Sequence, residues 1–124
     1  MFEFICVSLG AILGANARYK IYIRLGELNL NKDIFILIIN TFSSFSLGLF
    51  LSFIERSSSF IYSDQLVLFF SIGFLGSLST FSSFVYDLFD LCLKLKYFRA
   101  FKLFIISLSL GIIAFSIGFL VGNQ

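Results

Sequence analysis

The chain has 124 residues, of which 59% are hydrophobic and 13% are charged, with 19 phenylalanines and no histidine. A soluble domain of this length needs a much more polar surface, so the composition excludes a soluble protein and indicates an integral membrane protein. Asp and Glu lie almost entirely at the ends of the apolar stretches, so neither a hydrolytic triad nor a carboxylate metal site can be assembled. The sequence therefore argues against an enzyme.

Four apolar stretches, at about residues 4–23, 34–54, 66–89 and 103–121, are each long enough to cross a membrane. A helix needs about 20 apolar residues to cross a hydrocarbon core roughly 30 Å thick. We therefore expect an all-α membrane protein with one four-span domain over residues 1–124. Ala15-Asn16-Ala17 resembles a signal-peptide cleavage site. The residues before the first apolar stretch, however, include Glu3 and no Lys or Arg, which is the wrong charge for a signal peptide, so we expect the first span to be retained.

The third apolar stretch contains glycines and hydroxyl residues near its middle, and its continuation to Leu93 makes it longer than one crossing requires. This pattern predicts a break in the helix near Gly76–Ser83. Irregular backbone at membrane depth is tolerated where it lines a cavity. The carbonyls that a break releases, such as those of Gly76 and Ser79, are groups that bind bare alkali cations.

Phe81 and Phe84 are three residues apart, so they should project from one face of the helix that follows the break. The edge of a phenyl ring carries the positive part of its quadrupole, and it could face a small anion together with the Asn40 amide and the Ser82 hydroxyl. In a chain with 19 phenylalanines such a pair also arises by chance, so packing and an ion path both remain open.

Two further polar residues allow two interpretations each. Asn40 interrupts an apolar run, where an amide needs a hydrogen-bond partner, either a neighbouring helix or a bound species. Arg18 near the end of the first span either extends to the lipid headgroups or faces a polar vestibule.

Three motifs in this order resemble the CrcB/Fluc family of fluoride channels, small four-span proteins that assemble as antiparallel dimers. The first is a glycine-rich pattern ending in Arg-Tyr at Gly10–Tyr19. The second is an Asn followed by small residues and Leu-Gly at Asn40–Gly48. The third and most specific, GGLTTFSTF in the family, is Gly76–Phe84 here. The resemblance covers nearly the whole chain.

The resemblance implies a fluoride-specific channel subunit for passive efflux of F⁻, which lowers cytoplasmic fluoride, and implies no nucleotide or redox cofactor. It implies that Arg18 belongs to an aqueous vestibule, and that the backbone carbonyls of Gly76 and Ser79 hold a structural, untransported Na⁺ at the two-fold axis. It leaves the role of Asp87, where relatives usually carry Glu, open. The residues that it assigns to the fluoride pathway are Phe81, Phe84, Asn40, Ser82 and Thr80.

The chain also departs from the family pattern. Phe35-Ile36 stands where the family has Gly-Thr, Ser77 replaces the second glycine of the third motif, and the fourth span has few polar residues. These departures suggest that one of the two pathways of a dimer is impaired.

Basic residues are distributed unevenly between the two sides of the membrane. Arg56 is the only basic residue on one side. The other side carries Arg18, Lys20, Arg24, Lys32, Lys94, Lys96, Arg99 and Lys102. The positive-inside tendency then predicts a multi-pass protein of the bacterial inner (plasma) membrane with both termini outside. Because an antiparallel homodimer needs chains that insert both ways, we expect this chain to pair with an oppositely oriented paralogue.

Two alternatives complete the predictions. A small multidrug-type, proton-coupled exporter also has four spans, but no span centre here carries the acidic residue that proton exchange requires. A non-conducting structural subunit of a heterodimeric channel would keep the packing glycines without a working phenylalanine track. The partners expected are fluoride, membrane lipid and a second subunit, and no nucleic acid.

Overall fold

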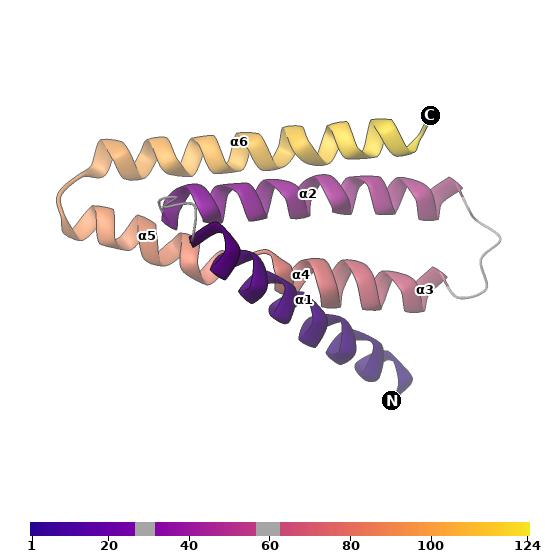
Figure 1. The fold of residues 1–124 in the computed structure, drawn as a ribbon. Coiled ribbons are helices and arrows are strands. Elements are labelled where there is room, and N and C mark those ends of the chain that lie inside the picture. Colours follow the sequence, from indigo (N-terminus) through magenta and orange to yellow (C-terminus); the bar gives the residue numbers. More distant parts are fainter. Residues whose placement is uncertain (27–31, 57–62) are drawn as a thin grey trace.

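The computed structural model describes residues 1–26, 32–56 and 63–124, and all the regular structure in these residues is helical (Figure 1). The elements are α1 (Phe2–Gly26), α2 (Lys32–Arg56), α3 (Ser63–Leu66), η1 (Val67–Leu75), α4 (Gly76–Leu78), α5 (Phe81–Leu93) and α6 (Tyr97–Gly122). The predicted all-α class is confirmed for this part of the chain.

Three helical stretches of the described residues are long and apolar enough to cross a membrane: Asp33–Arg56, Asp64–Leu93 and Tyr97–Gly122. They contain the second, third and fourth predicted spans. α1 also contains 25 residues, but Glu3 near its start and several basic residues in its second half interrupt its apolar sequence. A crossing by α1 stays a prediction.

The helices form two main contacts (Figure 1). α2 lies beside α6 over most of its length, while α1 crosses obliquely against η1 and α4. α5 continues beyond α4 and packs on α6. The N-terminus and the C-terminus lie at the same end of the molecule (Figure 1).

Glycines set the closeness of the main contacts. A Cβ atom added to Gly118 of α6 would overlap the carbonyl oxygen of Phe45 in α2, and one added to Gly10 of α1 would overlap the carbonyl oxygen of Phe69 in η1. In a membrane, where apolar burial does not drive helices together, such backbone contact provides much of the packing energy. Gly10 and Gly118 therefore allow the close approach of these helices.

η1 has the wide winding of a π-helix. Its end is marked by the N–H of Gly76, which donates to the carbonyl of Ser71 five residues earlier. π-helical turns are rare and often occur at functional sites. Nothing in the amino-acid sequence predicted this winding.

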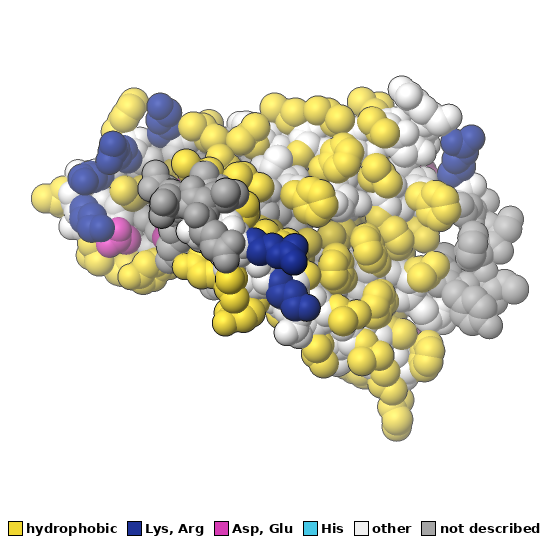
Figure 2. All heavy atoms as spheres, viewed as in Figure 1, with side chains coloured by type: hydrophobic (Ala, Val, Ile, Leu, Met, Phe, Trp, Pro, Cys, Tyr) yellow, Lys and Arg dark blue, Asp and Glu magenta, His cyan; other side chains and the backbone are white. Residues whose placement is uncertain are grey.

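A small apolar core lies next to the end of η1. It consists of Phe35, Ile36 and Ile39 from α2 with Leu75 and Leu78, each no more than 6% exposed. Phe35 and Ile36 are two of the residues at which the sequence departs from the family pattern, and they belong to this core. The remainder of the helical surface carries many exposed apolar side chains, as Figure 2 shows for one face.

Candidate functional site at Ser79 and Thr80

Ser79 and Thr80 separate α4 from α5. Ser79 has φ −67° and ψ 159°, and Thr80 has φ −135° and ψ 108°, so both residues have extended backbone. Gly76–Leu78 and the residues from Phe81 onward are helical, so the non-helical part is much shorter than the predicted range Gly76–Ser83. We call these two residues the interruption.

The interruption changes the partners of two backbone N–H groups. In a continuous α-helix the N–H of Thr80 would donate to the Gly76 carbonyl, and that of Ser83 to the Ser79 carbonyl. Here Thr80 N–H donates to Oδ1 of Asn40 at 2.8 Å, and Ser83 N–H donates to Oγ1 of Thr80 at 3.3 Å. The carbonyls of Gly76 and Ser79 are therefore released from these helical hydrogen bonds.

Asn40 on α2 pairs with the interruption through both ends of its amide. Its Nδ2 also donates to the carbonyl of Thr80 at 3.2 Å. The side chain thus satisfies one donor and one acceptor of the same residue, as a neighbouring strand would. This is an interhelical hydrogen bond, one of the two roles that the sequence left open for Asn40.

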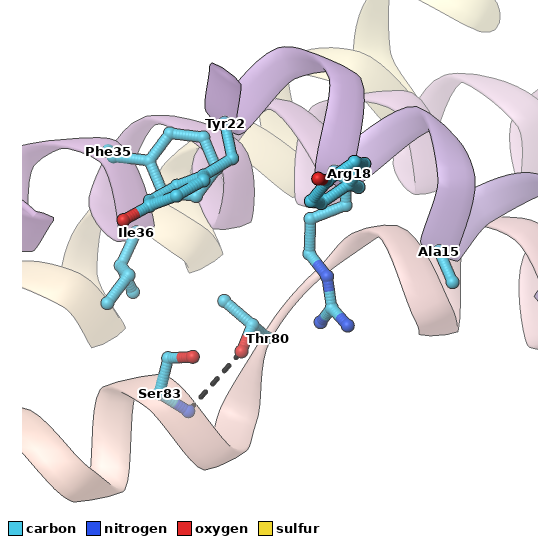
Figure 3. A pocket seen from close by; sticks show the side chains of 8 residues that line it. Ala15, Arg18, Tyr22, Phe35, Ile36, Thr80 and Ser83 are labelled. Carbon is cyan, nitrogen blue, oxygen red and sulfur yellow. Dashed lines mark hydrogen bonds between the residues drawn. The ribbon is translucent and has the colours of Figure 1, made fainter. Parts of the chain in front are cut away.

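Arg18 approaches the interruption from α1. Its Nη1 donates to the carbonyl of Ser79 at 3.2 Å, in a partly buried position. Arg18 lines a cavity of about 300 Å³ with Ala15, Tyr19, Tyr22, Phe35, Ile36, Thr80 and Ser83. In Figure 3 its guanidinium points toward the interruption. Its membership of an aqueous vestibule stays a prediction.

Both released carbonyls accept other hydrogen bonds. The Ser79 carbonyl accepts from Arg18, and the Gly76 carbonyl accepts from Oγ of Ser79 at 3.2 Å. Because a carbonyl oxygen has two lone pairs, each keeps one for another partner. No group of three or more Cys, Asp or Glu side chains that could hold a metal exists in the described residues. A cation at the interruption would therefore meet neutral oxygens and the charged Arg18.

The two candidate phenylalanines differ in their surroundings. Phe81 is 78% exposed, whereas Phe84 is half-buried, stacks on Phe104 of α6 with ring centroids 6.5 Å apart, and packs against the apolar core. Ser82 is exposed, and both hydrogen bonds of Asn40 go to Thr80 instead. Of the five predicted pathway residues, Asn40 and Thr80 are thus joined by hydrogen bonds, whereas Phe81 and Phe84 have different surroundings.

Most residues of the Arg18 cavity were not assigned a site role by the sequence, among them Tyr22 and Phe35. Tyr22 lies one helical turn after Arg18, and its ring meets that of Phe35 edge to face, with centroids 5.1 Å apart. The spacing from Arg18 could have indicated Tyr22. Phe35 could have been found as the large residue at a position where the family has glycine. Neither the spacing nor the family pattern predicts that the rings of Tyr22 and Phe35 meet.

The model of the family described as CrcB-like protein, Camphor Resistance (CrcB), matches residues 5–119. The chain belongs to the CrcB-like family. This is a family of ion channels and not of enzymes, so the exclusion of an enzyme and the resemblance drawn from the three motifs are both confirmed. CrcB-like relatives and the apolar helices together identify a multi-pass membrane protein.

Several CrcB-like relatives match over most of their length. A protein of Prochlorococcus marinus named fluoride-specific ion channel FluC 2 is 67% identical over 124 residues, which cover all of both chains. FluC 1 of Parasynechococcus marenigrum is 37% identical over 97% of this chain and 93% of its own. FluC of Ignicoccus hospitalis is 33% identical over 90% of this chain and 88% of its own.

Proposed function

We propose that this CrcB-like chain is a subunit of a fluoride-specific ion channel that lowers cytoplasmic fluoride by passive efflux of F⁻. The names of its relatives support the ion. The observation that carries the proposal is the pairing of Asn40 with Thr80, which stabilises non-helical backbone within a span long and apolar enough to cross the membrane. Such backbone is tolerated at membrane depth where it serves a cavity or path.

Neutral donors near the interruption can replace part of the hydration shell of a small anion. Asn40 uses one of its two amide N–H groups on Thr80, so the other is left for a ligand. The hydroxyl of Thr80 accepts from Ser83, so its own hydrogen is free to donate. Without a full positive charge, such donors favour quick passage over tight binding.

The phenylalanines would complete the pathway between two subunits. The exposed ring of Phe81 is available to a partner chain, while packing against α6 fixes the ring of Phe84. The path would be formed by Phe81 of one chain together with Phe84, Ser82 and Asn40, which the pairing of the two chains would bring to the same path. The phenylalanines would present their positive ring edges to F⁻. The exposure of Phe81 supports this division of roles.

A structural Na⁺ belongs to the proposal as well. The carbonyls of Gly76 and Ser79 would hold it, and the ion would tie two subunits together without being transported. One chain offers only two such carbonyls, which supports a site shared by two copies of the motif. The positive charge of Arg18, which donates to the Ser79 carbonyl, disfavours a cation at that carbonyl. The Gly76 carbonyl accepts from the neutral Ser79 hydroxyl, so it is the less obstructed ligand.

We further propose an antiparallel dimer with an oppositely oriented paralogue, in which both termini of this chain lie outside the cell. The uneven distribution of basic residues supports a single orientation. The alternative of a non-conducting subunit has its own support, because Phe35 and Ile36 fill the core beside the interruption.

Reconstitution tests the proposed function. The chain is purified with and without the paralogue, placed in liposomes loaded with fluoride, and efflux is followed with a fluoride electrode. We expect fluoride efflux without chloride efflux, and only with the paralogue present. Equal chloride efflux, or no fluoride efflux in either preparation, would show that the proposed function is wrong.

A further inference from the structure

A second cavity, of about 120 Å³, adjoins the interruption. It is lined by Ser43, Ser44, Leu47, Ser71, Leu75, Gly76 and Ser79, and we call it the serine pocket. It meets the interruption through Ser79, whereas the Arg18 cavity meets it through Thr80. Within the described part of the chain, no charged side chain lines the serine pocket, so its polar groups are hydroxyls and backbone groups.

Two hydroxyls of this pocket lack a partner. Ser43 is only 4% exposed, and its Oγ has no hydrogen-bond partner among the described residues. The same holds for the buried Oγ of Ser71 on η1. Ser116 shows the usual solution for a serine in a membrane helix, because its Oγ donates to the carbonyl of Ile112 at 2.9 Å. Ser43 and Ser71 do not adopt it, although an unpaired buried hydroxyl is costly.

The pocket has the size and the chemistry of a water site. A water molecule occupies about 30 Å³ in the liquid and needs two to four polar partners in a protein. Ser43 and Ser71 can donate, and Oγ of Ser79 can accept because its hydrogen is used on the Gly76 carbonyl. A neutral ligand that both accepts and donates fits this set.

We propose that the serine pocket binds ordered water, which bridges Ser43 and Ser71 and hydrates the interruption on the side of α2 and η1. Arg18 supplies the polar contact from α1. The inference rests on the packing of α2 against η1 and not on which ion the channel conducts.

Alanine variants test the proposal through the sign of their effect. If water bridges the hydroxyls, Ser43→Ala and Ser71→Ala each remove a partner of that water and lower the Tm of the purified full-length channel. The double variant should lose less than the sum of the two, because both hydroxyls hold the same water. Ser52→Ala is the matched control: Ser52 is on the same helix, 0% exposed and without a partner among the described residues, but does not line the serine pocket.

If the pocket were dry, Ser43→Ala would remove an unsatisfied hydroxyl, so its Tm would stay level or rise as for Ser52→Ala. That result would overturn the proposal. The unfolding is repeated with Na⁺ replaced by N-methylglucamine. Losses that persist without Na⁺ support water, whereas losses that vanish would show that the occupant is a cation and overturn the proposal.

Chemical access gives a second measurement that does not depend on stability. With Cys6 and Cys92 replaced by alanine, Ser43→Cys is compared with Ile39→Cys, since Ile39 is equally buried at 3% exposed but lies in the apolar core. We expect Ag⁺ to modify the thiol at position 43 at least about tenfold faster, because thiolate forms only where water reaches it. Equal rates would overturn the proposal.

Discussion

The side-chain amide of Asn40 pairs with both backbone groups of Thr80, accepting from its N–H at 2.8 Å and donating to its carbonyl at 3.2 Å. Asn40→Ala leaves both groups without this partner. Because an unsatisfied buried donor or acceptor costs about 1–3 kcal/mol, we expect a loss of that size in the free energy of unfolding. Thermal unfolding of the purified chain measures it.

A matched control for this variant is Asn16→Ala. The amide of Asn16 donates to the carbonyl of Ile12 in its own helix at an exposed position, so its loss should change stability by less than about 0.5 kcal/mol. Equal effects of the two variants would contradict the special role of Asn40. Asn40→Asp should also destabilise, since a carboxylate can accept from Thr80 but cannot donate to its carbonyl.

Phe81→Ile should abolish fluoride efflux from liposomes while leaving the fold intact. The side chain is 78% exposed, so its replacement removes little packing within the chain, but it removes the positive ring edge proposed to face the anion. Phe98→Ile, at an 82% exposed position of α6, provides the control for loss of an exposed phenylalanine. Unchanged efflux from the Phe81 variant would remove this ring from the mechanism.

Gly118→Ala should destabilise the contact between α2 and α6. The added methyl group would overlap the carbonyl oxygen of Phe45, and such overpacking costs about 1–3 kcal/mol. Gly111→Ala on the same helix has its nearest contact at an ordinary 3.6 Å, from Oγ of Ser44, and should be neutral or stabilising by up to about 1 kcal/mol. Both are measured by thermal unfolding, and a stabilising Gly118→Ala would contradict the backbone contact.

The positions of the long helices could be predicted because apolar length is a local property of the chain. The limits of the interruption could not. Glycine and serine at 76–83 permit non-helical backbone over the whole range, but the interruption falls at Ser79 and Thr80, where Asn40 from another helix provides hydrogen bonds. That choice depends on how α2 packs and leaves no local signal.

The surroundings of the candidate site residues are also set by packing. Phe81 and Phe84 look equivalent by spacing, yet only Phe84 meets α6, where it stacks on Phe104. The direction of Arg18 is decided by the carbonyl that the interruption releases. Sequence motifs can identify such residues, but the contacts of these residues depend on helices that are distant in the sequence.

An exposed ion pair predicts a simple pH response at the turn after α5. Lys94 Nζ lies 2.6 Å from a carboxylate oxygen of Asp90, and this hydrogen bond and charge raise the pKa of Lys94 above its usual 10.5. A raised lysine pKa contributes stability below the unfolded value, and this contribution is lost as the pH rises through the folded value. The difference in Tm between Lys94→Met and the wild type should therefore stay constant from about pH 6 to 9, since lysine stays charged there. A difference that grew within this range would contradict a Lys94 that stays charged throughout it.

The orientation of the chain can be tested through its termini, which lie at one end of the molecule (Figure 1). We expect alkaline phosphatase fused after Gln124 to be active outside the inner membrane, because the basic residues at the turn between α5 and α6 and at the start of α6 favour the cytoplasm. Neutralising the cluster by Lys94→Gln, Lys96→Gln, Arg99→Gln and Lys102→Gln should produce a mixed orientation, whereas Arg56→Gln at the other end should not. If the wild-type chain already inserts both ways, or conducts fluoride by itself in liposomes, pairing with an oppositely oriented paralogue is not required.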